Sequence, residues 1–173
     1  MRRILLVDDE INVLHALQRT LRRQAQGEHL GIDMFTNPFE ALARCCECNF
    51  DLVISDYRMP QMSGIELLSA LREVTPDTVR MILSASTEFD TVMSAINEAE
   101  VFRYLSKPWQ DADLQDQVRL ALIQRDKLVG EQHLANQRPP HVLTPQELEA
   151  KRLEEEEPGI MQVKWAPDGS IFL

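Results

Sequence analysis

Residues 50–60 have the sequence FDLVISDYRMP, in which a strand-length run over Leu52–Ser55 leads directly to an acidic residue, Asp56. Similar short runs precede and follow it along the chain, and helical stretches separate them. These further strands are expected at Ile4–Val7, Gly31–Phe35, Val79–Leu83 and Val101–Leu105. Strict alternation of strand and helix predicts an α/β fold, with a doubly wound parallel sheet covered by helices on both faces.

Capping sequences mark where two of the intervening helices begin. Asn37-Pro38-Phe39-Glu40 and Ser63-Gly64-Ile65-Glu66 each place a glutamate three residues after a capping residue. Another helix is expected from about Phe89 to Asn97. The final helix begins after Pro108 and either continues to about Asn136 or frays after about Gln124, because Gly130 interrupts it.

The charge balance restricts the class of protein. The 173 residues include 18 basic and 28 acidic side chains, for a net charge of −10, which argues against binding to nucleic acid or to anionic membrane. The apolar runs are too short to span a bilayer, and Met1-Arg2-Arg3 does not open a signal peptide. Cys45, Cys46 and Cys48 are expected to be reduced and to pack at a helix end, and the predicted location is the cytoplasm.

Chemically reactive side chains follow four of the five predicted strands, at the sheet edge where α/β proteins place their sites. They are Asp8 and Asp9 after the first strand, Asp56 after the third, Ser84 after the fourth and Lys107 after the fifth. Three carboxylates at one edge repel one another unless a cation such as Mg²⁺ neutralises them. One carboxylate is then available as a nucleophile that forms an acyl phosphate, with Lys107 and Ser84 as donors to the phosphoryl oxygens.

Four motifs stand in a fixed order along the chain: Val7–Glu10, Leu52–Leu68, Met81–Ala85 and Tyr104–Trp109. Together they resemble the receiver domain of bacterial two-component response regulators, and the resemblance covers roughly residues 1–125. It implies a flavodoxin-like (βα)5 sheet with strand order 2-1-3-4-5. It also implies phosphoryl transfer from the phosphohistidine of a sensor histidine kinase or of a phosphotransfer protein.

The resemblance assigns a phosphoacceptor and a metal site. Asp56 corresponds to the phosphoacceptor, and Asp9, Asp56 and the backbone carbonyl of Arg58 correspond to direct ligands of Mg²⁺. Asp8 is expected to reach the metal through water. The Arg58 side chain stands at a position that influences the lifetime of the phosphoryl group in this family.

The same resemblance assigns the switch. Lys107 is expected to contact the acyl phosphate, and its peptide bond to Pro108 is expected to be cis. Ser84 corresponds to the switch hydroxyl and Tyr104 to the switch aromatic residue. Phosphorylation is expected to draw Ser84 inward and to turn Tyr104 from an exposed to a buried position.

The C-terminal region is expected to be an appendage. Residues 1–130 are assigned to the receiver domain, 131–143 to a linker, and 144–173 to a small tail that is not an independent domain. A helix beginning at Thr144-Pro145-Gln146-Glu147 and a β-hairpin turning at Pro167-Asp168-Gly169 are predicted in this tail. The tail is short and acidic, so we expect no DNA-binding output and instead a protein partner or a homodimer.

Three alternatives remain at this point. An aspartyl-phosphate-forming, phosphatase-like enzyme would carry a second acid two residues after the nucleophile, where Arg58 stands, so we expect a switch that is not a turnover enzyme. The stretch Glu98–Tyr104 resembles receivers joined to cyclic-di-GMP signalling modules, so the chain could be the N-terminal part of such a regulator. A phosphorylation-independent scaffold would not need the acidic set.

Overall fold

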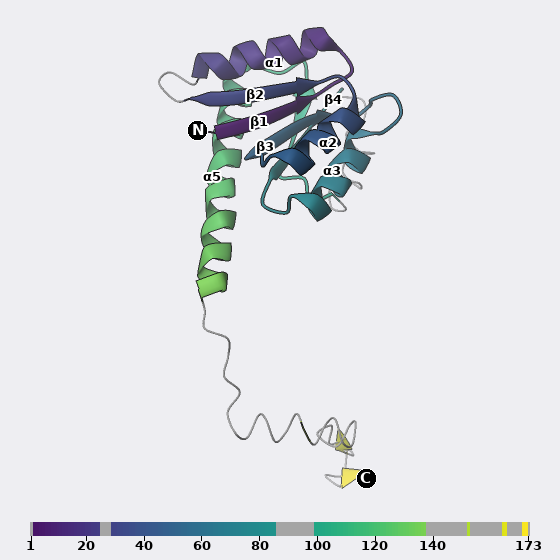
Figure 1. The fold of residues 1–173 in the computed structure, drawn as a ribbon, viewed down its shortest axis with the longest axis vertical. Helices are drawn as coiled ribbons and strands as arrows, with labels where there is room; N and C mark the ends of the chain where they lie inside the picture. The colour runs from purple at the N-terminus through teal and green to yellow at the C-terminus, as the bar shows by residue number, and fades with distance from the viewer. Residues whose placement is uncertain are drawn as a thin grey trace. The chain divides into compact units, whose positions relative to one another are not determined.

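The computed structural model describes residues 2–24, 29–85 and 99–137, together with Arg152, Lys164–Trp165 and Ile171–Phe172. The chain forms two compact units, Met1–Gln132 and His133–Leu173. A five-stranded parallel sheet lies in the first unit, in the order β2-β1-β3-β4-β5 that the family resemblance implies (Figure 1). The strands are β1 (Arg2–Val7), β2 (Leu30–Phe35), β3 (Leu52–Asp56), β4 (Val79–Ala85) and β5 (Arg103–Lys107).

Helices cover both faces of this sheet. They are α1 (Ile11–Gln24), α2 (Pro38–Glu47), α3 (Gly64–Val74) and α5 (Asp111–Gln137). The helices α1 and α5 pack on one face, and α2 and α3 pack on the other. The fold is therefore the predicted doubly wound one, although the helix expected at residues 89–97 lies outside the described residues.

The central strands are buried on both sides, which explains why their sequences are continuously apolar. In β1, Leu5 and Val7 join the core under α2 and α3, whereas Ile4 and Leu6 join the core under α1 and α5. All four side chains are at most 1% exposed. Burial of each contributes about 1.5–3 kcal/mol, so the two cores together hold the strand ends at fixed positions.

The two predicted helix caps are present in the structure. The Asn37 side chain accepts a hydrogen bond of 2.9 Å from the backbone N–H of Phe39 at the start of α2. Ser63 and Glu66 form a reciprocal capping box at the start of α3. Each cap satisfies backbone groups that the helix leaves without partners, a contribution of about 1 kcal/mol.

Several strand boundaries differ from the sequence-based expectation by one or two residues, and the start of β5 and the end of α5 are the two that change the organisation of the chain. The strand β5 begins at Arg103, two residues later than predicted, because Ala99 and Glu100 form a turn in which Glu100 has a φ of 49°. The buried Arg80 guanidinium donates to the Ala99 carbonyl at 3.1 Å and so holds this turn against β4. The helix α5 continues through Gly130 to Gln137, so the longer of the two expected helices is present and residues 131–137 of the predicted linker are helical.

The second unit contains a short antiparallel pair, in which β6 (Lys164–Trp165) faces β7 (Ile171–Phe172). This pair agrees with the predicted hairpin. The helix expected from residue 144 lies outside the described residues, apart from Arg152. None of the helices in the part of the chain that the structure describes combines the length and the apolar character that a membrane span requires.

The core under α2 and α3 allows a direct test of the packing. Leu68 in α3 is fully buried, whereas Val74 at the end of the same helix is 48% exposed. We expect Leu68→Ala to lower the free energy of unfolding by about 2–5 kcal/mol. The control Val74→Ala should change it by about 0.5 kcal/mol or less. Urea unfolding followed by circular dichroism measures both, and equal effects would contradict the assignment of the core.

Candidate functional site

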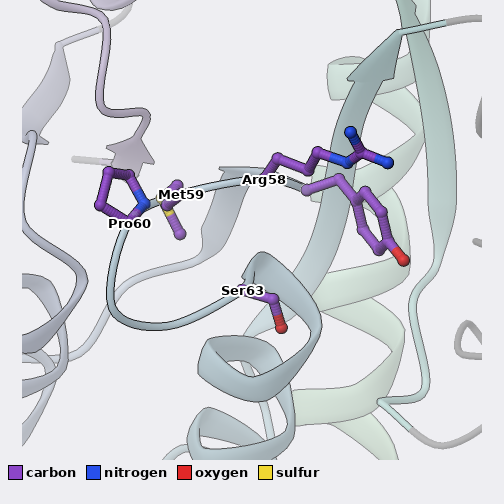
Figure 2. Close-up of a pocket in the computed structure, with 5 residues that line it drawn as sticks. Arg58, Met59, Pro60 and Ser63 are labelled. Carbon is purple, nitrogen blue, oxygen red and sulfur yellow. The ribbon is translucent and has the colours of Figure 1, made fainter.

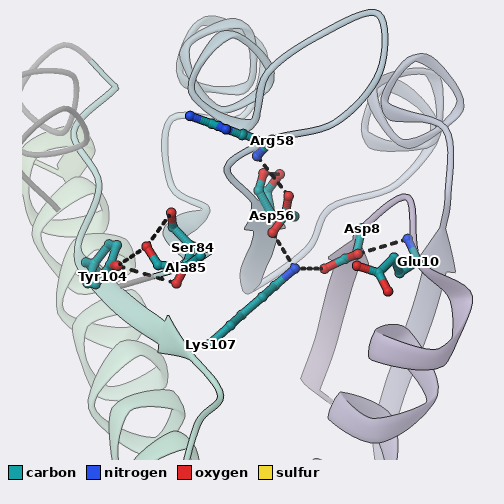
Figure 3. A network of polar contacts seen from close by, with 9 residues as sticks. Asp8, Glu10, Asp56, Arg58, Ser84, Ala85, Tyr104 and Lys107 are labelled. Atoms are coloured by element: carbon teal, nitrogen blue, oxygen red, sulfur yellow. Dashed lines mark hydrogen bonds and ion pairs between the residues drawn. The ribbon is translucent and has the colours of Figure 1, made fainter. Parts of the chain in front are cut away.

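Three of the residues predicted to act together lie at strand ends on one edge of the sheet and contact one another. Asp8 directly follows β1, Asp56 is the last residue of β3, and Lys107 is the last residue of β5. Since β1 and β3 are neighbours in the sheet, the two carboxylates emerge side by side. Figure 3 shows Lys107 reaching from β5 to the space between them.

The Lys107 ammonium is an ion-pair partner of both carboxylates. Its Nζ lies 2.7 Å from Oδ2 of Asp8 and also contacts Oδ1 of Asp56. The Asp8 side chain is fully buried and that of Asp56 is 9% exposed. Two carboxylates withdrawn from water would be costly without a counterion, so this ammonium is what allows them to stand together.

The other oxygen of each carboxylate is held by a backbone amide. Oδ1 of Asp8 accepts a hydrogen bond of 2.9 Å from the N–H of Glu10, and Oδ2 of Asp56 accepts one of 2.8 Å from the N–H of Arg58. Both carboxylates are therefore fixed in orientation. The sequence gives no signal for these two donors, because every residue except proline carries a backbone N–H.

Burial and the contact between Lys107 and Asp56 have opposite effects on the pKa of each of these two residues. Burial raises the pKa of Asp56, with the nearby Asp8 charge adding to the effect, even though Lys107 and the Arg58 amide oppose it. Burial also disfavours the charged form of Lys107, but its contacts with Asp56 and Asp8 outweigh this and raise its pKa. The lysine is therefore a permanent cation, whereas the ionised Asp56 is held at a cost in free energy.

The donor set fits Mg²⁺ in its chemistry. Asp8 and Asp56 offer hard oxygen ligands close to one point, and the exposed Asp9 follows Asp8 in the chain. Within residues 2–24, 29–85 and 99–137, however, no three carboxylate, histidine or cysteine side chains gather closely enough to hold a metal. Asp8 and Asp56 converge on the ammonium of Lys107, and Asp9 does not join them.

Ser84 is the second-last residue of β4 and Tyr104 is the second residue of the neighbouring β5, and Figure 3 draws a second group of contacts around them. The Tyr104 hydroxyl is 3.4 Å from the carbonyl oxygens of Ser84 and of Ala85. The Ser84 hydroxyl is also 3.4 Å from the Ala85 carbonyl. Ser84 is buried and Tyr104 is half-buried, and distances of this length indicate weak hydrogen bonds.

An open pocket of about 430 Å³ borders the loop that follows Asp56. Its lining consists of Tyr57, Arg58, Met59, Pro60 and Ser63. In Figure 2 the Arg58 side chain extends away from Met59 and Pro60. The long cation predicted to influence the phosphoryl group therefore lines open space next to Asp56, rather than packing into the core.

The raised pKa of Asp56 contributes a pH dependence to the stability of the folded protein. The cost of ionising the folded carboxyl is complete above its folded-state pKa, and it vanishes as the pH falls through that value towards about 3.9, the unfolded value. In EDTA at pH 8 we expect the free energy of unfolding of Asp56→Asn to be about 1 kcal/mol higher than that of the wild type, so the variant is the more stable protein. The difference should shrink towards pH 4.

Urea unfolding at several pH values measures this difference. The control Asp116→Asn, at a side chain that is 68% exposed, should leave stability nearly unchanged at every pH. A less stable Asp56→Asn at pH 8 would contradict the inferred cost of the buried charge.

Comparison with known proteins agrees with this geometry. The family model of the response regulator receiver domain matches residues 4–119. The chain is 33% identical over 130 residues to the hydrogenase transcriptional regulatory protein HoxA of Cupriavidus necator, and 33% identical over 123 residues to the transcriptional regulatory protein PrrA of Mycobacterium leprae. These matches cover 75% and 71% of this chain, but the chain spans only 26% of HoxA and 51% of PrrA.

Solved structures show the same similarity. The signal receiver domain of an HD domain-containing protein from Pseudomonas fluorescens is 34% identical, with a TM-score of 0.67 over 73% of this chain and 90% of that chain. A structure titled as an adenylate cyclase from Rhodopirellula baltica is 31% identical, with a TM-score of 0.72 over 79% and 98%. From the family match and the fold, the chain belongs to the response regulator receiver domain family.

Proposed function

We propose that this protein is a phosphorylation-controlled switch in which Asp56 accepts a phosphoryl group from the phosphohistidine of a sensor histidine kinase or of a phosphotransfer protein. The observation that carries the proposal is the position of Asp56, at a strand end beside Asp8 and in contact with the Lys107 ammonium. Membership of the receiver family supplies the donor class.

The transfer is a displacement at phosphorus. An oxygen of the Asp56 carboxylate forms the new O–P bond while the N–P bond of the phosphohistidine breaks, and the imidazole leaves with the electron pair and takes up a proton. The ammonium of Lys107, already at Oδ1 of Asp56, is placed to face the negative oxygens of the incoming group. The Arg58 amide keeps the carboxylate oriented during the attack.

Mg²⁺ is the proposed cofactor of this site. Asp9, Asp56 and the backbone carbonyl of Arg58 would hold the ion directly, and Asp8 would hold it through water. When bound, Mg²⁺ supplies positive charge that offsets the carboxylates and the phosphoryl oxygens. The buried Asp8 and Asp56 are suited to this role, since their charges already require a cation in the structure.

Ser84 and Tyr104 form the proposed switch. The Ser84 hydroxyl would leave the Ala85 carbonyl and turn towards the phosphoryl group. The Tyr104 hydroxyl would then leave the Ser84 carbonyl, and the ring would move inward. Contacts of 3.4 Å are easily exchanged for a hydrogen bond to a dianion, which is stronger. The surface around β5 and α5 would change as a result.

The proposed output is a contact with another protein or with a second copy of the chain, in the cytoplasm and without DNA binding or turnover catalysis. The acidic composition supports a protein partner. HoxA and PrrA carry the names of transcriptional regulators, but this chain spans about a quarter of the one and half of the other. Their activities therefore belong to this chain only as far as the receiver domain is concerned.

Acetyl phosphate tests the phosphoacceptor directly. With Mg²⁺ present, we expect the intact mass of the wild type to increase by one phosphoryl group, and we expect Asp56→Asn to remain unmodified because it lacks the nucleophilic oxygen. The exposed Asp113→Asn should be modified like the wild type. A stable modification of Asp56→Asn, or an unmodified wild type, would refute the assignment.

Mg²⁺ binding should stabilise the folded protein. At a magnesium concentration ten times the dissociation constant, we expect a gain of about 1.4 kcal/mol in the free energy of unfolding. Asp9→Asn should need more Mg²⁺ for the same gain, while the exposed Glu40→Gln on α2 should not. Urea unfolding at a series of Mg²⁺ concentrations measures the effect, and equal responses of the two variants would exclude Asp9 as a ligand.

A further inference from the structure

Gly64, the first residue of α3, lies directly against the peptide group of Asp56. A Cβ atom added to Gly64 would stand 2.0 Å from the Asp56 carbonyl oxygen, 3.0 Å from the Asp56 carbonyl carbon and 3.0 Å from Cδ1 of Ile82. Cβ atoms essentially never approach other atoms closer than 3.0 Å, so a side chain would require a displacement of about 1 Å or more. Position 64 therefore requires a residue without a side chain, because the peptide group of the proposed phosphoacceptor occupies the space that a Cβ atom would need.

Neither side of this contact can easily retreat. The Gly64 N–H donates to the Tyr57 carbonyl at 2.9 Å, and the Tyr57 N–H donates to the Leu83 carbonyl at 2.7 Å. The helix itself is fixed by its capping box and by leucines in the core, of which Leu67 and Leu68 are fully buried. A side chain at position 64 would therefore push on the peptide of Asp56 rather than move the helix as a whole.

We infer that Gly64 is a positioning residue, which sets the place of the Asp56 carboxylate relative to Lys107 and Asp8. The carboxylate depends on two contacts, from the Lys107 ammonium to Oδ1 and from the Arg58 amide to Oδ2. A shift of about 1 Å in the Asp56 backbone would lengthen both. This inference rests on the proposed phosphorylation of Asp56.

A second helical glycine provides a matched control. A Cβ atom added to Gly130 in α5 would meet nothing within 4 Å apart from its chain neighbours and the nearby backbone of its own helix, so Gly130→Ala makes the same chemical change in open space. We expect Gly130→Ala to keep the wild-type rate of phosphorylation by acetyl phosphate. Its melting temperature should rise by about 2–4 °C, because alanine favours a helix more than glycine does.

Gly64→Ala is expected to behave differently. It should fold, but its rate of phosphorylation by acetyl phosphate with Mg²⁺ should fall by about 100-fold, the effect of a misplacement of about 1 Å in a reacting group. The NMR amide resonance of Arg58 should also shift, since this amide donates to Asp56. Ile65→Val, a neighbouring core substitution, should leave that resonance in place while it lowers the melting temperature.

A double variant separates the two contacts that the new methyl group would make. Ile82→Val removes the Cδ1 atom near position 64 but leaves the Asp56 carbonyl in place. If displacement of Asp56 causes the defect, then Gly64→Ala/Ile82→Val should remain about as slow as Gly64→Ala. Recovery of the rate would show that crowding in the core is the cause, and would overturn the inference.

The remaining outcomes are also decisive. A Gly64→Ala variant within threefold of the wild-type rate would overturn the positioning role and leave the proposed phosphorylation of Asp56 intact. A variant that fails to fold at 10 °C would show that Gly64 supports the whole domain, and would also overturn it. A wild type that acetyl phosphate does not modify would instead refute the proposed function.

Discussion

The contact of one ammonium with two buried carboxylates is the interaction on which the site depends. Lys107 stands on β5, while Asp56 ends β3 and Asp8 follows β1, so the lysine side chain must reach across the end of β4. Neighbouring strands are about 4.8 Å apart, so two such spacings separate β5 from β3, and the lysine and aspartate side chains cover this distance together. The sheet order, the length of lysine and the closeness of the two acids are thus parts of a single arrangement.

This arrangement costs stability locally, and the rest of the domain offsets that cost. Burial raises the pKa of Asp56, so the ionised form is disfavoured in the folded protein. The central strands are packed on both faces by apolar side chains, and those cores hold the strand ends in place. A site with unbalanced charge gains free energy from binding Mg²⁺ and from a well-placed phosphoryl group, which is what the proposed switch requires.

The contacts around Asp56 differ between the side of α3, where the packing is close, and the end of β4, where two hydroxyl contacts are long. Backbone hydrogen bonds and the close approach of Gly64 fix the peptide of Asp56 against α3. At the end of β4, by contrast, the hydroxyl of Ser84 lies 3.4 Å from the Ala85 carbonyl oxygen, and the hydroxyl of Tyr104 lies 3.4 Å from the Ser84 carbonyl oxygen. This difference suits the proposed switch, in which Asp56 stays in place while Ser84 and Tyr104 rearrange.

The sequence by itself determined the alternation of strands and helices, two helix caps and the polar residues at the strand ends, because these depend on local periodicity and capping chemistry. The family resemblance added the strand order. Only the tertiary structure decided that β5 begins at Arg103, that Lys107 contacts Asp8 as well as Asp56, and that Gly64 touches the Asp56 peptide. The physical reason is that contacts between residues distant in the chain depend on how whole helices and strands pack. The capping sequence around Gly64 predicts the start of a helix, but it does not predict which carbonyl group the glycine will contact.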